Sequence, residues 1–138
     1  MILQTNPGLN EKVQEFGCAF MDILWFCVLE GALTINNLKD IEKLYNEAVR
    51  LNAMNKNCFI LNWNETFRVG GLDVVYTDRH EPPDRMCEPD EIEILRFPGH
   101  FVAGNGQSVV TYDSYGRSRA VETGNLKNKR IFLVRGLV

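Results

Sequence analysis

Apolar residues crowd the first part of the chain and alternate with polar residues further along. From Gly17 to Leu29 almost every position is apolar, and Asp22 is the one charged residue in this run. A segment that is apolar on most sides predicts a helix surrounded by protein. We therefore expect a central, buried helix over residues 17–29.

A second helix is predicted after Thr34, a residue type that caps helix N-termini. Apolar positions then recur every three or four residues down to an Asn-rich break near Asn52. These positions are Leu38, Ile41, Leu44, Tyr45, Ala48 and Leu51. The spacing indicates an amphipathic helix at the surface of the protein.

Beyond Gly70 and Gly71 the apolar period shortens towards two, which is typical of β-strands. The segments with this pattern are Leu72 to Thr77, Glu91 to Phe97, Phe101 to Gly104, Val109 to Tyr112 and Arg130 to Val134. Helices followed by strands predict an α+β fold, with the buried N-terminal helix packed on an antiparallel sheet formed by the C-terminal half. The length and the lack of linkers or repeats predict a single domain over residues 1–138.

The charge of the chain narrows the choice of partners. There are 18 acidic and 15 basic residues, so the protein carries no cationic field that would hold a nucleic acid or an anionic membrane. The most apolar stretch is shorter than the roughly 20 residues that span a bilayer, and the first twelve residues lack a secretory signal pattern. We expect a cytoplasmic protein that binds neither nucleic acid nor membrane.

The four cysteines lie far apart, without a Cys-x-x-Cys pair. This spacing favours reduced thiols over a disulfide framework or a zinc site. No nucleotide or dinucleotide fingerprint is present, because the glycine clusters do not lead from a strand into a helix. We therefore expect no metal and no cofactor.

Cys18 stands at the expected N-terminus of the buried helix, directly after Gly17. Unpaired N–H groups and the helix dipole favour an anion at this place, so they would lower the pKa of the thiol and face an oxyanion. The alternative is a small apolar residue that fills the core. Cys27 lies nine residues further on, which places it on the opposite face of the helix, and we assign it to the core.

His100 begins a predicted strand that turns through Asn105 and Gly106, and Asp113 ends the next strand. With a loop of two or four residues, His100 lies opposite Thr111 or Asp113, and in both cases it shares a face with Asp113. A loop of odd length would separate them. A carboxylate beside an imidazole stabilises its cationic form, as a general base requires. The alternatives are a structural histidine and a carboxylate that caps a turn.

The order of these motifs resembles compact papain-like cysteine peptidases. The shared features are a Gly-Cys pair opening an apolar helix, a His-Phe-Val strand start at residues 100–102, and Val-Thr-Tyr-Asp at residues 110–113 with a glycine just beyond. Closest in style are the double-glycine leader peptidases of bacteriocin export and their uncharacterised bacterial and phage relatives. The resemblance implies that Cys18 is the nucleophile, His100 the base and Asp113 the residue that orients His100.

The resemblance also implies an oxyanion donor shortly before the cysteine, and Gln14 is the candidate. Gly17 would let a substrate approach closely. Two functions follow. One is a cysteine hydrolase, a peptidase or amidase, that acts on a peptide or protein substrate through a thioester. The other is an inactive papain-like domain that binds or inhibits a protein partner, for instance one encoded by a phage.

Two other groups of residues have simpler interpretations. His80 lies in a polar, proline-rich stretch that predicts an exposed loop, and no zinc spacing links it to Cys87. The basic residues Lys127, Lys129 and Arg130 predict a solvated edge of the sheet.

Overall fold

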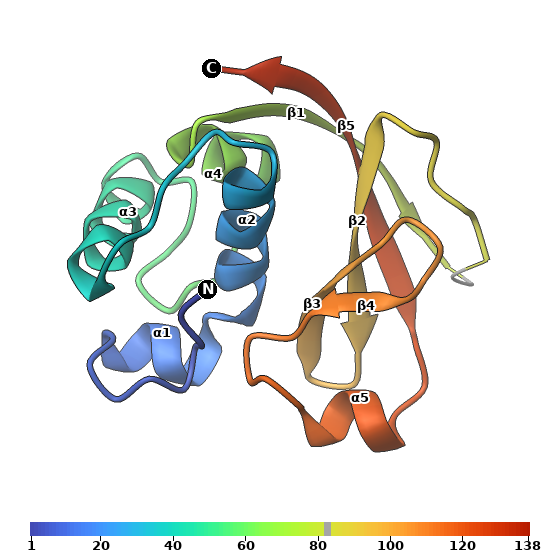
Figure 1. Ribbon diagram of the computed structural model, residues 1–138, viewed down its shortest axis with the longest axis horizontal. Coiled ribbons are helices and arrows are strands. Elements are labelled where there is room, and N and C mark those ends of the chain that lie inside the picture. The colour runs from blue at the N-terminus through green and yellow to red at the C-terminus, as the bar shows by residue number, and fades with distance from the viewer. Residues whose placement is uncertain (82–83) are drawn as a thin grey trace.

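The computed structural model describes residues 1–81 and 84–138 and shows most of the helices gathered on one side of a curved sheet (Figure 1). The helices are α1 (Glu11–Phe16), α2 (Cys18–Leu29), α3 (Leu38–Arg50), α4 (Trp63–Val69) and α5 (Arg119–Thr123). The strands are β1 (Leu72–His80), β2 (Glu91–Phe97), β3 (His100–Gly104), β4 (Val110–Tyr112) and β5 (Asn128–Leu137). The five strands form one sheet in the order β1-β5-β2-β3-β4, and all neighbouring strands are antiparallel. The predicted α+β class and antiparallel sheet are confirmed.

Helix α2 lies between α3 and the sheet (Figure 1). It is apolar on nearly all sides, and most of its side chains are buried. The helix begins at Cys18 with Gly17 as its N-cap, within one residue of the predicted boundary. The one charged residue of the run, Asp22, is also fully buried. The buried helix is confirmed, and it carries an acidic group into the core.

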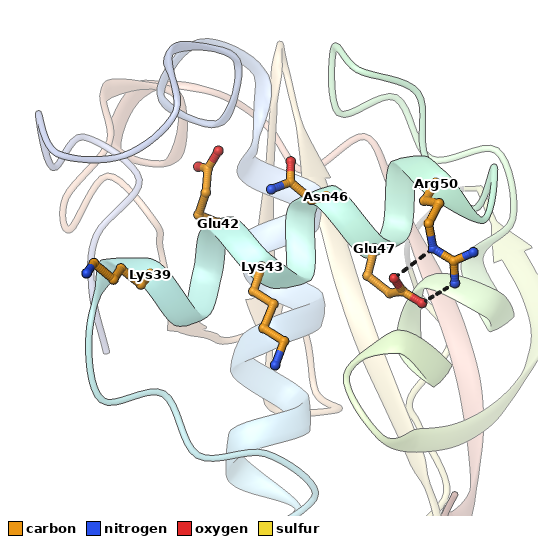
Figure 2. Close-up of a pocket in the computed structure, with 6 residues that line it drawn as sticks. All are labelled: Lys39, Glu42, Lys43, Asn46, Glu47 and Arg50. Carbon is orange, nitrogen blue, oxygen red and sulfur yellow. Dashed lines mark hydrogen bonds and ion pairs between the residues drawn. The ribbon is translucent and has the colours of Figure 1, made fainter.

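Helix α3 is amphipathic, as the spacing predicted, but its cap differs from the prediction. Asn37, not Thr34, is the N-cap: its side chain accepts from the backbone N–H of Asp40, and the Asp40 side chain accepts from the backbone of Asn37. This reciprocal pair satisfies two N–H groups that a single Thr could not. Figure 2 shows the polar side chains that α3 presents on its outer face, among them the ion pair between Glu47 and Arg50.

The two longest strands, β1 and β5, extend beyond the segments that the sequence indicated. They pair with each other over most of their length, from Leu72 opposite Leu137 to His80 opposite Lys129. The end of this pair at which His80 lies opposite Lys129 is polar. The apolar alternation that indicates a strand therefore stops before the pairing does. Three short helices, α1, α4 and α5, were not predicted, since five to seven residues are too few for a helical period to show.

The sheet has a hydrophobic core on each face. The larger core joins α2, α3 and α4 to one face through residues such as Phe20, Phe67 and Phe132. The smaller core, built on Leu95 and Val102, lies against α5. Among the described residues, no helix has both the length and the apolar character to cross a membrane.

Candidate active site

The junction between α1 and α2 fixes the position of Cys18. Gly17 separates the two helices, and a Cβ at this position would lie 2.5 Å from the carbonyl oxygen of Val13. The close approach of the α1 backbone therefore requires glycine at residue 17. This reason is internal to the fold and differs from the predicted one, which was room for a substrate.

The loop of the hairpin between β3 and β4 has neither of the two lengths predicted from the sequence, two or four residues. Gly104 pairs with Val110, so the loop comprises residues 105–109 and has an odd length. Such a loop alone would place the histidine and the aspartate on opposite faces. A β-bulge lies between this pair and the next, Ala103 with Tyr112, and shifts the register by one residue. The bulge returns the two side chains to the same face.

His100 and Asp113 meet in the interior. His100 Nε2 lies 2.7 Å from Asp113 Oδ1, and the two side chains are only 2% and 6% exposed. The expected contact between them is confirmed, although it depends on a bulge and not on an even loop. The ring of Tyr115 stacks on the imidazole, with centroids 4.5 Å apart and planes within 2°. The imidazole is therefore held from its edge and from its face.

Asp113 is held in its ionised form. Burial alone would raise the pKa of this carboxyl, but hydrogen bonds from Ser118 and His100 and from the backbone of Tyr115 outweigh burial and lower it. The N–H groups of Ser118 and Tyr115 lie 2.9 and 3.0 Å from the carboxylate oxygens. Both oxygens of the carboxylate therefore accept hydrogen bonds.

The other ring nitrogen of His100 is unengaged. Nδ1 is buried, and no hydrogen-bond partner for it exists in the described part of the chain. Since Nε2 is bonded to Asp113, Nδ1 is the position at which a proton can be taken up or released. The arrangement can therefore serve as a buried acid–base group.

Cys18 lies beside the backbone of Phe101, the residue that follows His100. Backbone N–H groups of Phe101 and Ala19 face its sulfur and favour a thiolate. Burial, and after it the charge of Asp22, outweigh them and raise the pKa of the thiol to about 11. The prediction of a lowered pKa is thus wrong for the free protein, because burial exceeds the effect of the helix N-terminus.

Asp22 belongs to the site but was not predicted from the sequence. It lies one turn after Cys18 on α2, and neither of its carboxyl oxygens has a hydrogen-bond partner among the described residues. Burial, and then the charge of Asp113, raise its pKa well above the usual range. Its position as the one charged residue in an apolar helix was the signal in the sequence.

The glutamine predicted as oxyanion donor is turned elsewhere. Gln14 Nε2 donates to the carbonyls of Leu9 and Pro7, at 2.7 and 3.4 Å, so it does not face Cys18. Gln4 is fully buried beside the turn that follows Asp113, where its Oε1 accepts from the Ser114 hydroxyl at 2.6 Å. Nothing in the local sequence around Gln4 indicated this contact, since 110 residues separate the partners.

A cavity of about 370 Å³ opens beside Cys18 between α2 and the sheet. Its walls also include Cys58, Phe59, Trp63, Phe101, Tyr115, Arg96 and Arg130. A different hollow, of about 400 Å³, lies along the outer face of α3 (Figure 2), but its lining comes from that one helix. The cavity beside Cys18 joins a nucleophile, apolar walls and cations, so it is the candidate site for a substrate.

His80, the alternative candidate, does not line the cavity beside Cys18. His80 is half-buried and bonds to Asp78 and Asp84, at 3.2 and 2.8 Å. In the part of the chain that the structure describes, no three His, Cys, Asp or Glu side chains are grouped so that they could hold a metal ion. Cys87 lies apart from His80 and contacts Glu93. All four cysteines are free thiols.

Comparison with known proteins gives one family. A family described as "Protein of unknown function, DUF261" matches residues 1–134. No curated protein and no solved structure matches the chain.

Proposed function

We propose that this chain, which belongs to the DUF261 family of unknown function, is a papain-like cysteine hydrolase that cleaves a peptide or amide bond. The observation that carries the proposal is the buried His100–Asp113 pair, with a free Nδ1, beside a cysteine at a helix N-terminus. We place the reaction in the cytoplasm, where free thiols stay reduced.

The reaction begins with the transfer of the Cys18 proton to His100 Nδ1. Cys18 Sγ attacks the carbonyl carbon of the substrate, and the resulting oxyanion accepts hydrogen bonds from N–H groups at the start of α2, such as that of Ala19. The carbon–nitrogen bond then breaks, and His100 gives its proton to the leaving amine. The acyl group remains on Cys18 as a thioester.

Hydrolysis of the thioester restores the protein. A water molecule loses a proton to His100 and attacks the acyl carbon, the bond to sulfur breaks, and the proton returns to Cys18. Throughout both steps Asp113 orients the imidazole and stabilises its cationic form. The raised pKa of Cys18 means that the thiolate is formed together with the imidazolium and is not present beforehand.

The same raised pKa favours a second candidate function. A thiol buried beside an acidic residue is a poor nucleophile, and a domain that only binds a protein partner has no need of a thiolate. In this case the cavity beside Cys18 is a binding surface, and the chain is an inactive papain-like module.

Alkylation of the four cysteines across a pH series separates the two functions. For a hydrolase, iodoacetamide modifies Cys18 at neutral pH faster than the other three cysteines, because His100 accepts the proton as the sulfur attacks, and His100→Ala reduces this rate by about tenfold or more. Cys58 lines the same cavity and is the internal control, because its rate must not depend on His100. Mass spectrometry of tryptic peptides gives the rate at each position.

The contrary outcome is equally clear. If Cys18 is modified at the same rate in the wild type and in His100→Ala at every pH, then no general base acts on it. That result removes the hydrolase and leaves the binding module.

A further inference from the structure

Two arginines in the wall of the cavity have no carboxylate partner. Arg96 of β2 and Arg130 of β5 lie diagonally on one face of the sheet, since Arg130 pairs with Ile94. In the described part of the chain no acidic side chain forms an ion pair with either guanidinium. By contrast, Arg85 of the adjoining loop has Glu91 at 3.0 Å.

Aromatic rings hold both guanidinium groups in place. The Arg96 Cζ lies 4.6 Å from the ring centroid of Phe101, and the Arg130 Cζ lies 5.1 Å from the same ring. The Arg130 Cζ also lies 5.2 Å from the ring of Trp63. Stacking occupies the flat face of a guanidinium and leaves the N–H groups at its edge free to bind an anion in a bidentate way.

The burial of Arg130 is only partly compensated within the described part of the chain. Burial lowers the pKa of Arg130; Tyr76 opposes this effect, and the nearby charges of Arg79 and Arg96 lower the pKa further. Of the other residues lining the cavity, Glu15 is the one acid. Although the chain as a whole has a net charge of −3, the cavity is locally cationic. An anionic ligand would therefore relieve a repulsion that the free protein contains.

The rest of the cavity is apolar and open to solvent. Phe59 is 66% exposed and Phe16 is 44% exposed at its rim, and Ile60 also lines the cavity. Cys18 lines the same space and is close enough to Arg96 to feel its charge. Apolar walls, two cations and a nucleophile thus converge on one volume of about 370 Å³.

We propose that this cavity selects substrates that carry a carboxylate beside an apolar group, with the carboxylate bound by Arg96 and Arg130 next to the bond that Cys18 attacks. The inference rests on the proposed hydrolase for its chemical step and on the arginines alone for its binding step. The carboxylate is either the free C-terminus of a peptide or the side chain of Asp or Glu.

Binding of matched probes to the Cys18→Ala protein tests the inference without any reaction. The first pair is N-acetylphenylalanine and its neutral amide. The second pair is the amide of N-acetylglutamate and that of N-acetylglutamine. We expect the charged member of at least one pair to bind about tenfold more tightly than its neutral partner. The pair with the larger ratio identifies the C-terminal or the side-chain source. NMR titration of the Trp63 indole signal, with Trp25 as reference, gives the affinities.

The variants Arg96→Gln and Arg130→Gln should each reduce this preference to less than about twofold. Arg68→Gln is the matched control, because Arg68 is exposed and lies outside the cavity lining. Equal binding of charged and neutral probes, or an unchanged preference in both variants, overturns the inference. Thermal unfolding of each variant verifies that it is folded.

The outcome is independent of the alkylation experiment. If the charged probe binds through the arginines but Cys18 shows no dependence on His100, the carboxylate site stands and the hydrolase fails. If Cys18 is activated but the probes bind equally, the hydrolase stands and this specificity fails.

Discussion

Two groups of buried charged residues lie in the same sheet, and they differ in how their polar atoms are satisfied. In the first, Glu93 Oε1 accepts from Lys129 Nζ at 2.8 Å, while Oε2 accepts from the backbone N–H groups of Gly106 and Ser108 at 3.0 and 2.8 Å. Lys129 also donates to the carbonyl of Arg85 at 2.8 Å. Both charged side chains are completely buried, and each charge is compensated.

The second group, around Cys18, leaves three of its buried polar atoms unpaired. Neither oxygen of Asp22 nor Nδ1 of His100 has a partner among the described residues. A buried polar atom without a partner costs free energy, so a fold keeps it only where something else requires it. The Glu93–Lys129 pair holds the sheet and its loop together, whereas the group at Cys18 has the free positions that chemistry needs.

The largest expected effect comes from breaking the compensated pair. Lys129→Met leaves Glu93 buried without its cation, and we expect it to lower the free energy of unfolding by about 3–5 kcal/mol. Lys127→Met, two residues away on the exposed surface, is the control and should change it by less than about 0.5 kcal/mol. Urea unfolding measures both variants. A loss below about 1 kcal/mol for Lys129→Met would show that the pair contributes little.

The sequence did not reveal this pair. Lys129 stands among basic residues that predicted a solvated edge, and that prediction is wrong for Lys129, which is fully buried. Its partner lies 36 residues away, and only the pairing of β2 with β5 brings the two together. Local patterns cannot carry such information, since they contain no register between distant strands.

The sequence was more informative where a local pattern decides the structure. The unbroken apolar run predicted the buried helix α2, and the residue types at Cys18, His100 and Asp113 indicated one site. The contact between His100 and Asp113 was predicted for the wrong loop length, because the bulge near Ala103 has no signature in the sequence. The pKa of Cys18 depends on how deeply it is buried, which a motif does not specify.

The next effect concerns Asp113, whose pKa is lowered in the folded protein. A carboxyl whose pKa is lowered by folding stabilises the protein at pH values above its pKa in the unfolded chain, which is about 3.9. This stabilisation is lost as the pH falls through its pKa in the folded protein. Asp113→Asn should therefore cost about 1–3 kcal/mol at pH 7 and much less in acid. Urea unfolding at pH 7 and pH 3 measures the difference, with the exposed Asp90→Asn as control. An equal cost at both pH values would contradict the charged form of Asp113.

Asp22 should show the opposite dependence on pH. Folding raises the pKa of Asp22, so as the pH rises this carboxyl ionises in the unfolded chain before it ionises in the folded protein. Between the unfolded and the folded pKa, the buried carboxyl therefore lowers the stability of the protein as the pH rises. Asp22→Asn removes that cost, and we expect a gain of about 1 kcal/mol at pH 8 that disappears near pH 3. The same unfolding series measures it. A loss of stability at pH 8 would mean that the carboxylate has a partner that stabilises it.

The smallest effect is that of Asp22 on the thiol. Because the charge of Asp22 is the second cause, after burial, that raises the pKa of Cys18, Asp22→Asn should lower this pKa from about 11. We expect the rate of alkylation of Cys18 at pH 8 to rise about threefold, since more of the thiol is ionised. Cys87, outside the cavity lining, should react at an unchanged rate in the same sample. Suppose that Asp22→Asn stabilises the protein but Cys18 reacts no faster. Asp22 then destabilises the fold without raising the pKa of the Cys18 thiol.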